Sequence, residues 1–375
     1  MAAKIKLGSK DVRSKQPQVT AALVAMAKKL GPGAKMPTAR ELVRTLGVAS
    51  STLMRCIDIL ERRRVLHSRQ GSGIYVDDRV AQKAVALVFG ENIFAKSASE
   101  FGSLVLKCCA LRAAQHNERF TFSLDLPGIV NEQAPAVPAL LDIADAFHEG
   151  MVDGVILLNG PKHEAWLRNQ GVPVVSGSPS EDDPRANVVS IDYRQLVQRG
   201  VEALFDAGCR TVGVIGVFLN HKKLFQAALH ERGLRVNEEW MVAPQSNLGS
   251  VSERHAALGE TYADQFLTQC GWSMSNRTKA HLPDGLLITE DMLAFGVLTA
   301  LARRGVRIGR DLKICTHSNM GSQVLAEWES KILHVRFNPE DFAMALFDML
   351  EDLMAGKPRS RRCLVGPMGK ADEAR

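Results

Sequence analysis

Several features that define other protein classes are missing from this 375-residue sequence. It contains no run of about 18 apolar residues, which argues against a membrane-spanning helix. The start is basic but no apolar segment follows it, so we expect no signal peptide. We therefore expect a cytoplasmic protein that has no contact with a membrane.

Cysteine is present but in no metal-binding or disulfide pattern. The seven cysteines are odd in number and lie mostly within apolar periodic segments, which favours reduced thiols in the cytosol. No CxxC or Cys/His ligand spacing occurs, so a zinc site is not expected. Nor is there an internal repeat or a low-complexity tract. We expect no metal and no cofactor.

The common catalytic motifs are also missing. We find no P-loop, no GxSxG, no HExxH and no GxGxxG after a strand. The GSG at 71–73 does not count, because it lies in a predicted hairpin. The sequence therefore predicts a protein that is not an enzyme.

Positive charge is concentrated at the N-terminal end. Residues 1–76 contain 15 Lys and Arg against 4 Asp and Glu, a net charge of +11, whereas residues 77–375 have a net charge of −5. A basic module on a mildly acidic body indicates that the first part binds a polyanion. A basic tail without a partner is the alternative, but residues 37–76 have the pattern of a folded domain.

Two short helices joined by a tight turn are predicted in residues 37–63. Thr38 and Glu41 have capping-box spacing, and Gly47 suits the end of the first helix. Ser50 or Ser51 is the expected cap of the second helix, in which apolar residues recur at helical spacing. This order is the helix-turn-helix plan, whose second helix reaches the bases of the DNA major groove.

A basic β-hairpin follows. Residues 65–68 and 74–76 alternate like strands, and the Gly-rich stretch 70–73 is the predicted turn. We expect DNA contacts from the first residues of the second helix, from Arg40 and from the hairpin. The predicted DNA-binding residues are Thr38, Arg40, Ser50, Ser51, Thr52, Arg55, Arg69, Gln70, Gly71 and Gly73.

This segment resembles the winged-helix domain of the GntR family of bacterial repressors. The resemblance covers roughly residues 15–76 and rests on MPTAREL at 36–42, LGV at 46–48 and RQGSGIYV at 69–76. It implies that the second helix and the hairpin, or wing, touch DNA. Ser50 and Arg64 depart from the family pattern, which often has Arg at the first position and Gly at the second. Base preference therefore cannot be carried over.

Each of these residues also has a purely structural interpretation. Arg40 could be a solvated helix charge, and Ser51 and Thr52 could be caps only. Residues 62–64 are three consecutive arginines, which could face phosphates or simply be solvated. Gly71 and Gly73 could serve turn geometry alone.

After a polar linker at 77–83, apolar strand-like runs alternate with amphipathic helices from residue 84 onward. Such alternation predicts an α/β fold with parallel sheets, and the length favours two lobes. Ligands of such folds bind beyond the carboxyl ends of the strands, in the crevice between lobes.

Residues 84–370 resemble the LacI-type effector domain, which is related to periplasmic sugar-binding proteins. The resemblance rests on VDGVI at 152–156, GVPVV at 171–175, AGCRTVGVIG at 207–216, TEDMLAFG at 289–296 and GVRIGRDL at 305–312. It implies a two-lobed domain (84–375) that binds an effector and dimerises, with lobe crossings near residues 192, 319 and 337. Residues 1–76 would form the winged helix-turn-helix domain.

The pocket positions depart from the family. His221 stands where the resemblance implies a sugar-gripping Arg, Glu290 where Asn is common, and Ser318 where an Asp accepts sugar hydroxyls. Such a set could suit another polyol, an amine-bearing ligand or no ligand. The predicted effector-binding residues are Asn92, Phe94, Ser178, Phe218, His221, Glu290 and Ser318.

The alternatives at this site are structural. Asp192 and Asp291 are expected to cap helices rather than to bind a ligand, and His221 could be only a helix-start residue. Phe94 and Phe218 could stack on a ligand or pack in the core.

The sequence thus predicts a ligand-responsive transcriptional regulator, a repressor that binds a pseudo-palindromic DNA operator as a homodimer. Its effector would be a small polar molecule such as a sugar or related polyol. The alternative is a DNA-binding or architectural protein whose effector domain has lost its ligand response.

Overall fold

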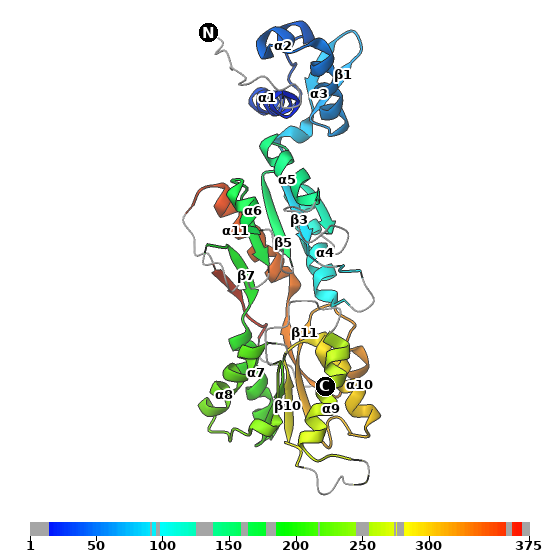
Figure 1. The fold of residues 1–375 in the computed structure, drawn as a ribbon, viewed down its shortest axis with the longest axis vertical. Helices are drawn as coiled ribbons and strands as arrows, with labels where there is room; N and C mark the ends of the chain where they lie inside the picture. Colours follow the sequence, from blue (N-terminus) through cyan, green and yellow to red (C-terminus); the bar gives the residue numbers. More distant parts are fainter. Residues whose placement is uncertain are drawn as a thin grey trace.

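In the computed structural model the chain is elongated, with a helical head at one end and two α/β lobes below it (Figure 1). The structure describes residues 15–90, 92–94, 98–124, 138–158, 164–177, 185–216, 218–244, 255–273, 275, 281–357 and 362–369. Within these residues no helix is long and apolar enough to cross a membrane. All seven cysteines are free thiols.

The head contains three helices and a two-stranded antiparallel hairpin. Its elements are α1 (Lys15–Leu30), α2 (Ala39–Leu46), α3 (Ser50–Arg62), β1 (Leu66–Arg69) and β2 (Gly73–Val76). The sequence interpretation had not described α1, which buries Val19, Leu23 and Val24 against the apolar faces of α2 and α3. Helix α1 packs directly on α3, and α2 packs on α3 in turn.

The linker is ordered against the head. Residues Asp78–Ala81 form a turn of 3-10 helix, and the side chain of Asp77 accepts a hydrogen bond from the Arg79 backbone N–H. Val80 is 4% exposed and belongs to the head's apolar core. This segment therefore holds its place by packing and capping rather than serving as an open tether.

The lobe next to the head is built on a six-stranded parallel sheet in the order β13-β7-β6-β5-β3-β4. Its strands are β3 (Ala84–Phe89), β4 (Arg119–Leu124), β5 (Gly154–Leu158), β6 (Val174–Gly177), β7 (Val188–Ile191) and β13 (Arg362–Val365). Helices α4 (Glu100–Gln115) and α11 (Pro339–Met354) pack on one face. Helices α5 (Pro138–His148) and α6 (Glu164–Asn169) pack on the other.

The far lobe has a five-stranded parallel sheet in the order β12-β11-β10-β8-β9. Its strands are β8 (Val212–Ile215), β9 (Met241–Val242), β10 (Gly285–Ile288), β11 (Lys313–Asn319) and β12 (Leu333–Phe337). Helices α7 (Tyr193–Asp206) and α8 (Leu219–Glu231) cover one face, and α9 (His255–Gln269) and α10 (Asp291–Arg303) cover the other. The predicted α/β class with parallel sheets is confirmed.

The chain passes between the two sheets after β7, after β12 and after β13. Asp192 begins α7 of the far lobe, and Asn338 begins α11 of the near lobe. After β13 the chain returns, because the Met368 N–H donates to the Arg336 carbonyl. The segment after Asn319 differs from the expected crossing, since β12 pairs directly with β11 in the same sheet.

Arg64, directly after α3, has a positive φ of 54°. A left-handed conformation costs a residue with a Cβ roughly 1–2 kcal/mol. Glycine avoids that penalty but loses more chain entropy on folding. We therefore expect Arg64→Gly to stabilise the head by about 0.5–1 kcal/mol, measured by urea unfolding.

The control for this change is Arg62→Gly, two residues earlier at the last residue of α3. Because Arg62 is helical, glycine there should destabilise the head, by up to about 1 kcal/mol. An Arg64→Gly head that unfolds as easily as the Arg62→Gly head would contradict the role assigned to the backbone angle.

Candidate functional site

The first turn of α2 is fixed by a complete capping box. The Thr38 N–H donates to Glu41 Oε2 at 2.8 Å, and the Glu41 N–H donates to Thr38 Oγ1 at 3.3 Å. Hydrogen bonds from Thr38 hold the pKa of Glu41 below its ordinary value. Thr38 therefore has a structural role, and Arg40 is exposed on the turn that it caps.

Helix α3 begins differently from the expectation that a serine caps it. Its N-cap is Ala49, which has no side chain that can accept a hydrogen bond. Ser50 and Ser51 are therefore the first two residues of the helix, and both are exposed. Because the helix N-terminus carries partial positive charge, their hydroxyl groups sit where an anion or a base edge would be attracted.

The next two predicted contact residues lie on the same turns. Thr52 is half-buried and Arg55 is exposed. Met54, which the sequence interpretation did not include, is 50% exposed between them. An exposed apolar side chain on such a helix can touch the methyl group of thymine. Its signal in the sequence was the break that it makes in the apolar periodicity.

The wing turn depends on two glycines with positive φ, Gly71 at 71° and Gly73 at 119°. Turn geometry therefore accounts for both glycines by itself. Arg69 and Gln70 are exposed at this tip. The Arg69 guanidinium lies 4.5 Å from the centre of the Tyr75 ring, which supports it from below.

Tyr75 organises the wing and was missed by the sequence interpretation. The Tyr75 hydroxyl lies 2.7 Å from Ser72 Oγ. The His67 ring stacks on the Tyr75 ring, with the two ring centres 5.8 Å apart. The pairing of His67 with Tyr75 across the hairpin could have signalled this contact, because directly opposed side chains of two strands share a face.

A second cluster of predicted site residues lies where the two lobes meet. His221 is completely buried, and its Nδ1 lies 2.8 Å from Thr289 Oγ1. Its ring packs against Tyr193 at 4.7 Å and Phe218 at 5.0 Å. Burial lowers the pKa of His221 to about 3, so the ring is neutral. The buried Nε2 of His221 has no hydrogen-bond partner among the described residues.

Glu290 and Asp291 are two adjacent carboxyl groups at the start of α10. Glu290, not Asp291, is the N-cap, because its Oε2 accepts from the Leu293 N–H at 2.6 Å. Asp291 instead accepts from Asn319 Nδ2 at 2.9 Å and from Ser99 Oγ at 3.3 Å. Ser99 belongs to the near lobe, so this last hydrogen bond joins the two lobes.

The pKa values of the two carboxyl groups are shifted in opposite directions. Burial and the neighbouring negative charge of Glu290 raise the pKa of Asp291 well above its ordinary value. Burial also acts to raise the pKa of Glu290, but hydrogen bonding and charge from His255, 3.4 Å away, lower it overall. The site therefore offers one charged acceptor and one carboxyl group that can donate.

The remaining predicted effector residues do not all join this cluster. The Ser318 hydroxyl lies 3.2 Å from His334 Nδ1, on the β11 face opposite His317 and Asn319. Asn92 caps its own turn by accepting from the Phe94 N–H. Ser178 lies outside the described residues. Asp192, as expected, caps α7 through the Gln195 N–H.

Phe94 lies apart at the edge of the cleft. It is 61% exposed, and it lines an open pocket of ≈ 290 Å³ between the lobes. Ile93 and Ala98 contribute the near-lobe wall of this pocket, and Met292 and Phe295 contribute the far-lobe wall. No group of three or more potential metal ligands occurs among the described residues.

Two families match the two parts of this chain. Residues 18–76 match the bacterial regulatory proteins of the gntR family, and residues 201–370 match the periplasmic binding protein-like domain. The chain is thus similar to gntR-family regulators in its head and to periplasmic binding protein-like domains in its body. The gntR family consists of regulatory proteins, and the relatives and solved structures named below are regulators of transcription.

Among curated relatives, catabolite control protein A of Staphylococcus epidermidis is 28% identical over 172 residues, 45% of this chain and 48% of the relative. The HTH-type transcriptional repressor MelR of Bacillus subtilis is 22% identical over 213 residues, 55% of this chain and 58% of MelR. The chain thus aligns with about half the length of these relatives.

Solved structures share the fold. The transcription regulator CcpA of Lactococcus lactis has a TM-score of 0.57 at 16% identity, covering 78% of this chain and all of that one. The regulator CelR in complex with cellobiose has a TM-score of 0.58 at 16% identity, covering 94% of this chain and 97% of its own.

The depressed pKa of His221 predicts a dependence of stability on pH. Between its ordinary pKa of 6.5 and its folded value of about 3, the unfolded chain binds a proton that the folded chain does not. Stability is therefore lost as the pH falls through this window, by up to ~1.4 kcal/mol per pH unit. Asp291, whose folded pKa is raised, opposes this loss. When the pH falls from 6.5 to 4.5, the His221→Asn variant should therefore lose about 2 kcal/mol less of its free energy of unfolding than the wild type loses.

Urea unfolding at the two pH values measures this difference. His116, which is exposed, provides the matched control, because His116→Asn should leave the loss as it is in the wild type. An equal loss in wild type and His221→Asn would mean that the buried ring does not control the acid response.

Proposed function

We propose that this protein is a ligand-responsive, DNA-binding transcriptional regulator that acts as a repressor. The observation that carries the proposal is the union of a basic winged helix-turn-helix head with a two-lobed body whose lobes meet at buried polar groups. The regulators among the relatives support it. Such a regulator works on DNA in the cytoplasm.

On DNA, the exposed start of α3 enters the major groove, with Ser50, Ser51 and Arg55 nearest the base edges. The wing places Arg69 and Gln70 against the backbone or the adjacent minor groove. A single head reaches few base pairs, so two copies would read the two halves of a pseudo-palindromic operator. We assign the pairing of the two copies to the body.

The effector binds between the lobes in this proposal, beside His221, Glu290 and Asp291. CelR, a fold neighbour, is in complex with cellobiose, which supports a sugar or related polyol. The residues themselves favour a ligand with several hydroxyl groups or an amine. Glu290 would accept from either, the Asp291 carboxyl would donate to an oxygen, and His221 Nε2 offers an unused position.

The proposal has a distinct alternative, a DNA-binding protein whose body no longer responds to a ligand. Buried Asp291 already has partners in Asn319 and Ser99, so the lobes are held together without a ligand. The two functions differ in whether a small molecule changes DNA affinity.

The DNA-binding half predicts a strong effect of salt and of Arg40. If about 6–10 phosphates are contacted per dimer, affinity should fall by roughly 10³–10⁵ between 50 and 200 mM salt, because counterions are released on binding. Arg40→Ala should weaken binding by about 1–3 kcal/mol. Fluorescence anisotropy measures both, with a duplex selected from a random library by the wild-type protein.

Arg310→Ala is the matched control, since Arg310 is an exposed arginine of the far lobe. It should bind the duplex like the wild type. Binding that responds neither to salt nor to Arg40→Ala would remove the basis for a DNA-binding head.

The effector half predicts that Glu290→Gln abolishes the response to a ligand. Gln retains an oxygen that can cap α10 but removes the charge, so the fold is preserved while the site changes. Cellobiose and glucosamine are the probes, one a neutral polyol and one an amine. A bound ligand raises the melting temperature of the wild type by mass action, and Glu290→Gln should lose this rise.

DNA affinity without a ligand should stay within about twofold in Glu290→Gln, because the head is a separate unit; a twofold change is only about 0.4 kcal/mol. Glu327→Gln, an exposed far-lobe change, is the control. If neither probe shifts the wild-type melting temperature or its DNA affinity, the ligand-independent alternative is favoured.

A further inference from the structure

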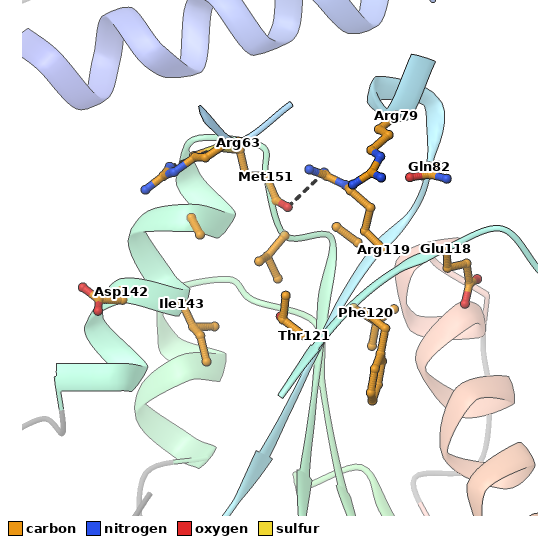
Figure 2. A pocket seen from close by; sticks show the side chains of 14 residues that line it. Arg63, Arg79, Gln82, Glu118, Arg119, Phe120, Thr121, Asp142, Ile143 and Met151 are labelled. Carbon is orange, nitrogen blue, oxygen red and sulfur yellow. Dashed lines mark hydrogen bonds between the residues drawn. The ribbon is translucent and has the colours of Figure 1, made fainter. Parts of the chain in front are cut away.

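A second pocket lies between the head and the body, far from the cleft between the lobes. Its volume is ≈ 680 Å³, within the range of roughly 300–1,000 Å³ that small-molecule sites occupy. Its walls come from the end of α3, the linker, the starts of β3 and β4, and α5 with the turn that follows it (Figure 2). None of the functions described above uses it.

Three guanidinium groups line this pocket, and each belongs to a different part of the chain. Arg63 comes from the head, Arg79 from the linker and Arg119 from the first residue of β4. Figure 2 shows Arg79 and Arg119 reaching toward the same corner of the pocket. Burial lowers the pKa of Arg119, the charge of Asp153 opposes this, and the positive charge of Arg79 lowers the pKa further, so the two cations repel each other.

These cations are incompletely neutralised. Arg119 donates to the Met151 carbonyl at 3.1 Å, but its buried Nε has no partner among the described residues. Arg63 pairs with Glu149 at 2.8 Å. For Arg79 the described part of the chain provides no ion pair. Two adjacent guanidinium groups facing a cavity are an arrangement that an anion would stabilise.

The carboxylates near the pocket neutralise this charge only in part. Asp153 acts on Arg119, but its two oxygens accept hydrogen bonds from Lys28 and from the Ala84 N–H. Glu118 is engaged in a buried ion pair with Arg112, which also bonds Glu351 at 2.5 Å. Asp142 lies on α5, across the pocket from Arg79 and Arg119 (Figure 2).

The side of the pocket next to α5 is apolar. Ile143 and Val152 line it there and belong to the apolar core on that face of the sheet. A pocket with a cationic rim and an apolar side is matched by a molecule that carries an anionic group on an apolar body.

We propose that this pocket binds a small organic anion, a carboxylate or phosphate attached to an apolar group. The anionic group lies between Arg79 and Arg119, and the apolar part rests on Ile143 and Val152. The site is separate from the cleft between the lobes, so its occupant would be a second effector.

Binding there would act on the position of the head. The anion touches the linker and the body at once, and Arg63 brings the end of α3 to the same rim. A ligand that bridges these parts binds the docked arrangement better than an undocked one, and it shifts the population toward the docked head. Its occupancy would therefore change DNA affinity without any contact with DNA.

Isothermal titration calorimetry of the full chain with phenyl phosphate and with benzoate tests the proposal. At least one of the two should bind, and the stronger one identifies phosphate or carboxylate as the preferred group. Benzyl alcohol, which has the same ring but no charge, should not bind. Absence of binding by both anions, or equal binding of benzyl alcohol, would overturn the proposal.

Arg79→Gln should weaken binding of the preferred anion at least tenfold. Because Arg79 is exposed, the variant should fold like the wild type. Arg119→Lys, which keeps the charge but loses the planar fork, should also weaken it. Arg310→Gln should bind like the wild type. Unchanged affinity in Arg79→Gln would show that the anion binds elsewhere.

DNA binding by Arg79→Gln without the anion should equal that of the wild type, because Arg79 lies outside α2, α3 and the wing. In the wild type the preferred anion should change DNA affinity, and in Arg79→Gln it should not. An anion that binds but leaves DNA affinity unchanged would contradict the coupling to the head.

Discussion

The turn between α5 and β5 is the point at which the head and the body become one structure. Met151 in this turn is 6% exposed and completes the apolar core of the head. Glu149 pairs with Arg63 at the end of α3, and Asp153 pairs with Lys28 of α1. The other oxygen of Asp153 accepts from the Ala84 N–H, so the same residue fixes the start of β3. The head is thereby anchored to the central strands of the near lobe.

Helix α4 connects this region with the cleft. Its 16 residues span about 24 Å at 1.5 Å per residue. At the start of the helix, Ser99 Oγ donates to Asp291 of the far lobe. The Glu100 carboxylate accepts from the Gln323 N–H of the same lobe. Near its other end Arg112 bonds Glu118 and Glu351, and Glu118 lines the pocket beneath the head. One rigid element therefore has its two ends at the two candidate ligand sites.

The sequence was sufficient for the parts of the structure that depend on local pattern. Capping-box spacing at Thr38, the Gly-rich wing turn and the alternation of strands with helices each reflect neighbours in the chain, and the fold contains them. It was not sufficient where a backbone angle or a tertiary contact decides. Ala49 has no side chain that would identify it as a cap, and glutamate at 290 is not among the residues that usually cap helices.

The direction of side chains in the cleft was also beyond the sequence. Ser318 and His317 are adjacent, yet alternation along β11 sends them to opposite faces, and only the packing of β12 and α10 decides which face meets the cleft. The burial of His221 by Tyr193 and Phe218 depends on three segments that meet only in the folded lobe. Helix α1 carries an apolar face, but its partners are likewise tertiary.

The position of Glu290 at the N-cap of α10 has a consequence for any molecule that enters the cleft. Glu290 Oε2 holds the Leu293 amide, so a ligand either bonds the other carboxylate oxygen, Oε1, or draws Oε2 away and exposes that amide. A ligand with a hydrogen-bond acceptor of its own could replace Oε2. The Leu293 N–H would then donate to the ligand instead of to Glu290. A ligand and the Glu290 side chain would then compete to cap the same helix end. The shape of the ligand would decide whether the first turn of α10 keeps its hydrogen bonds.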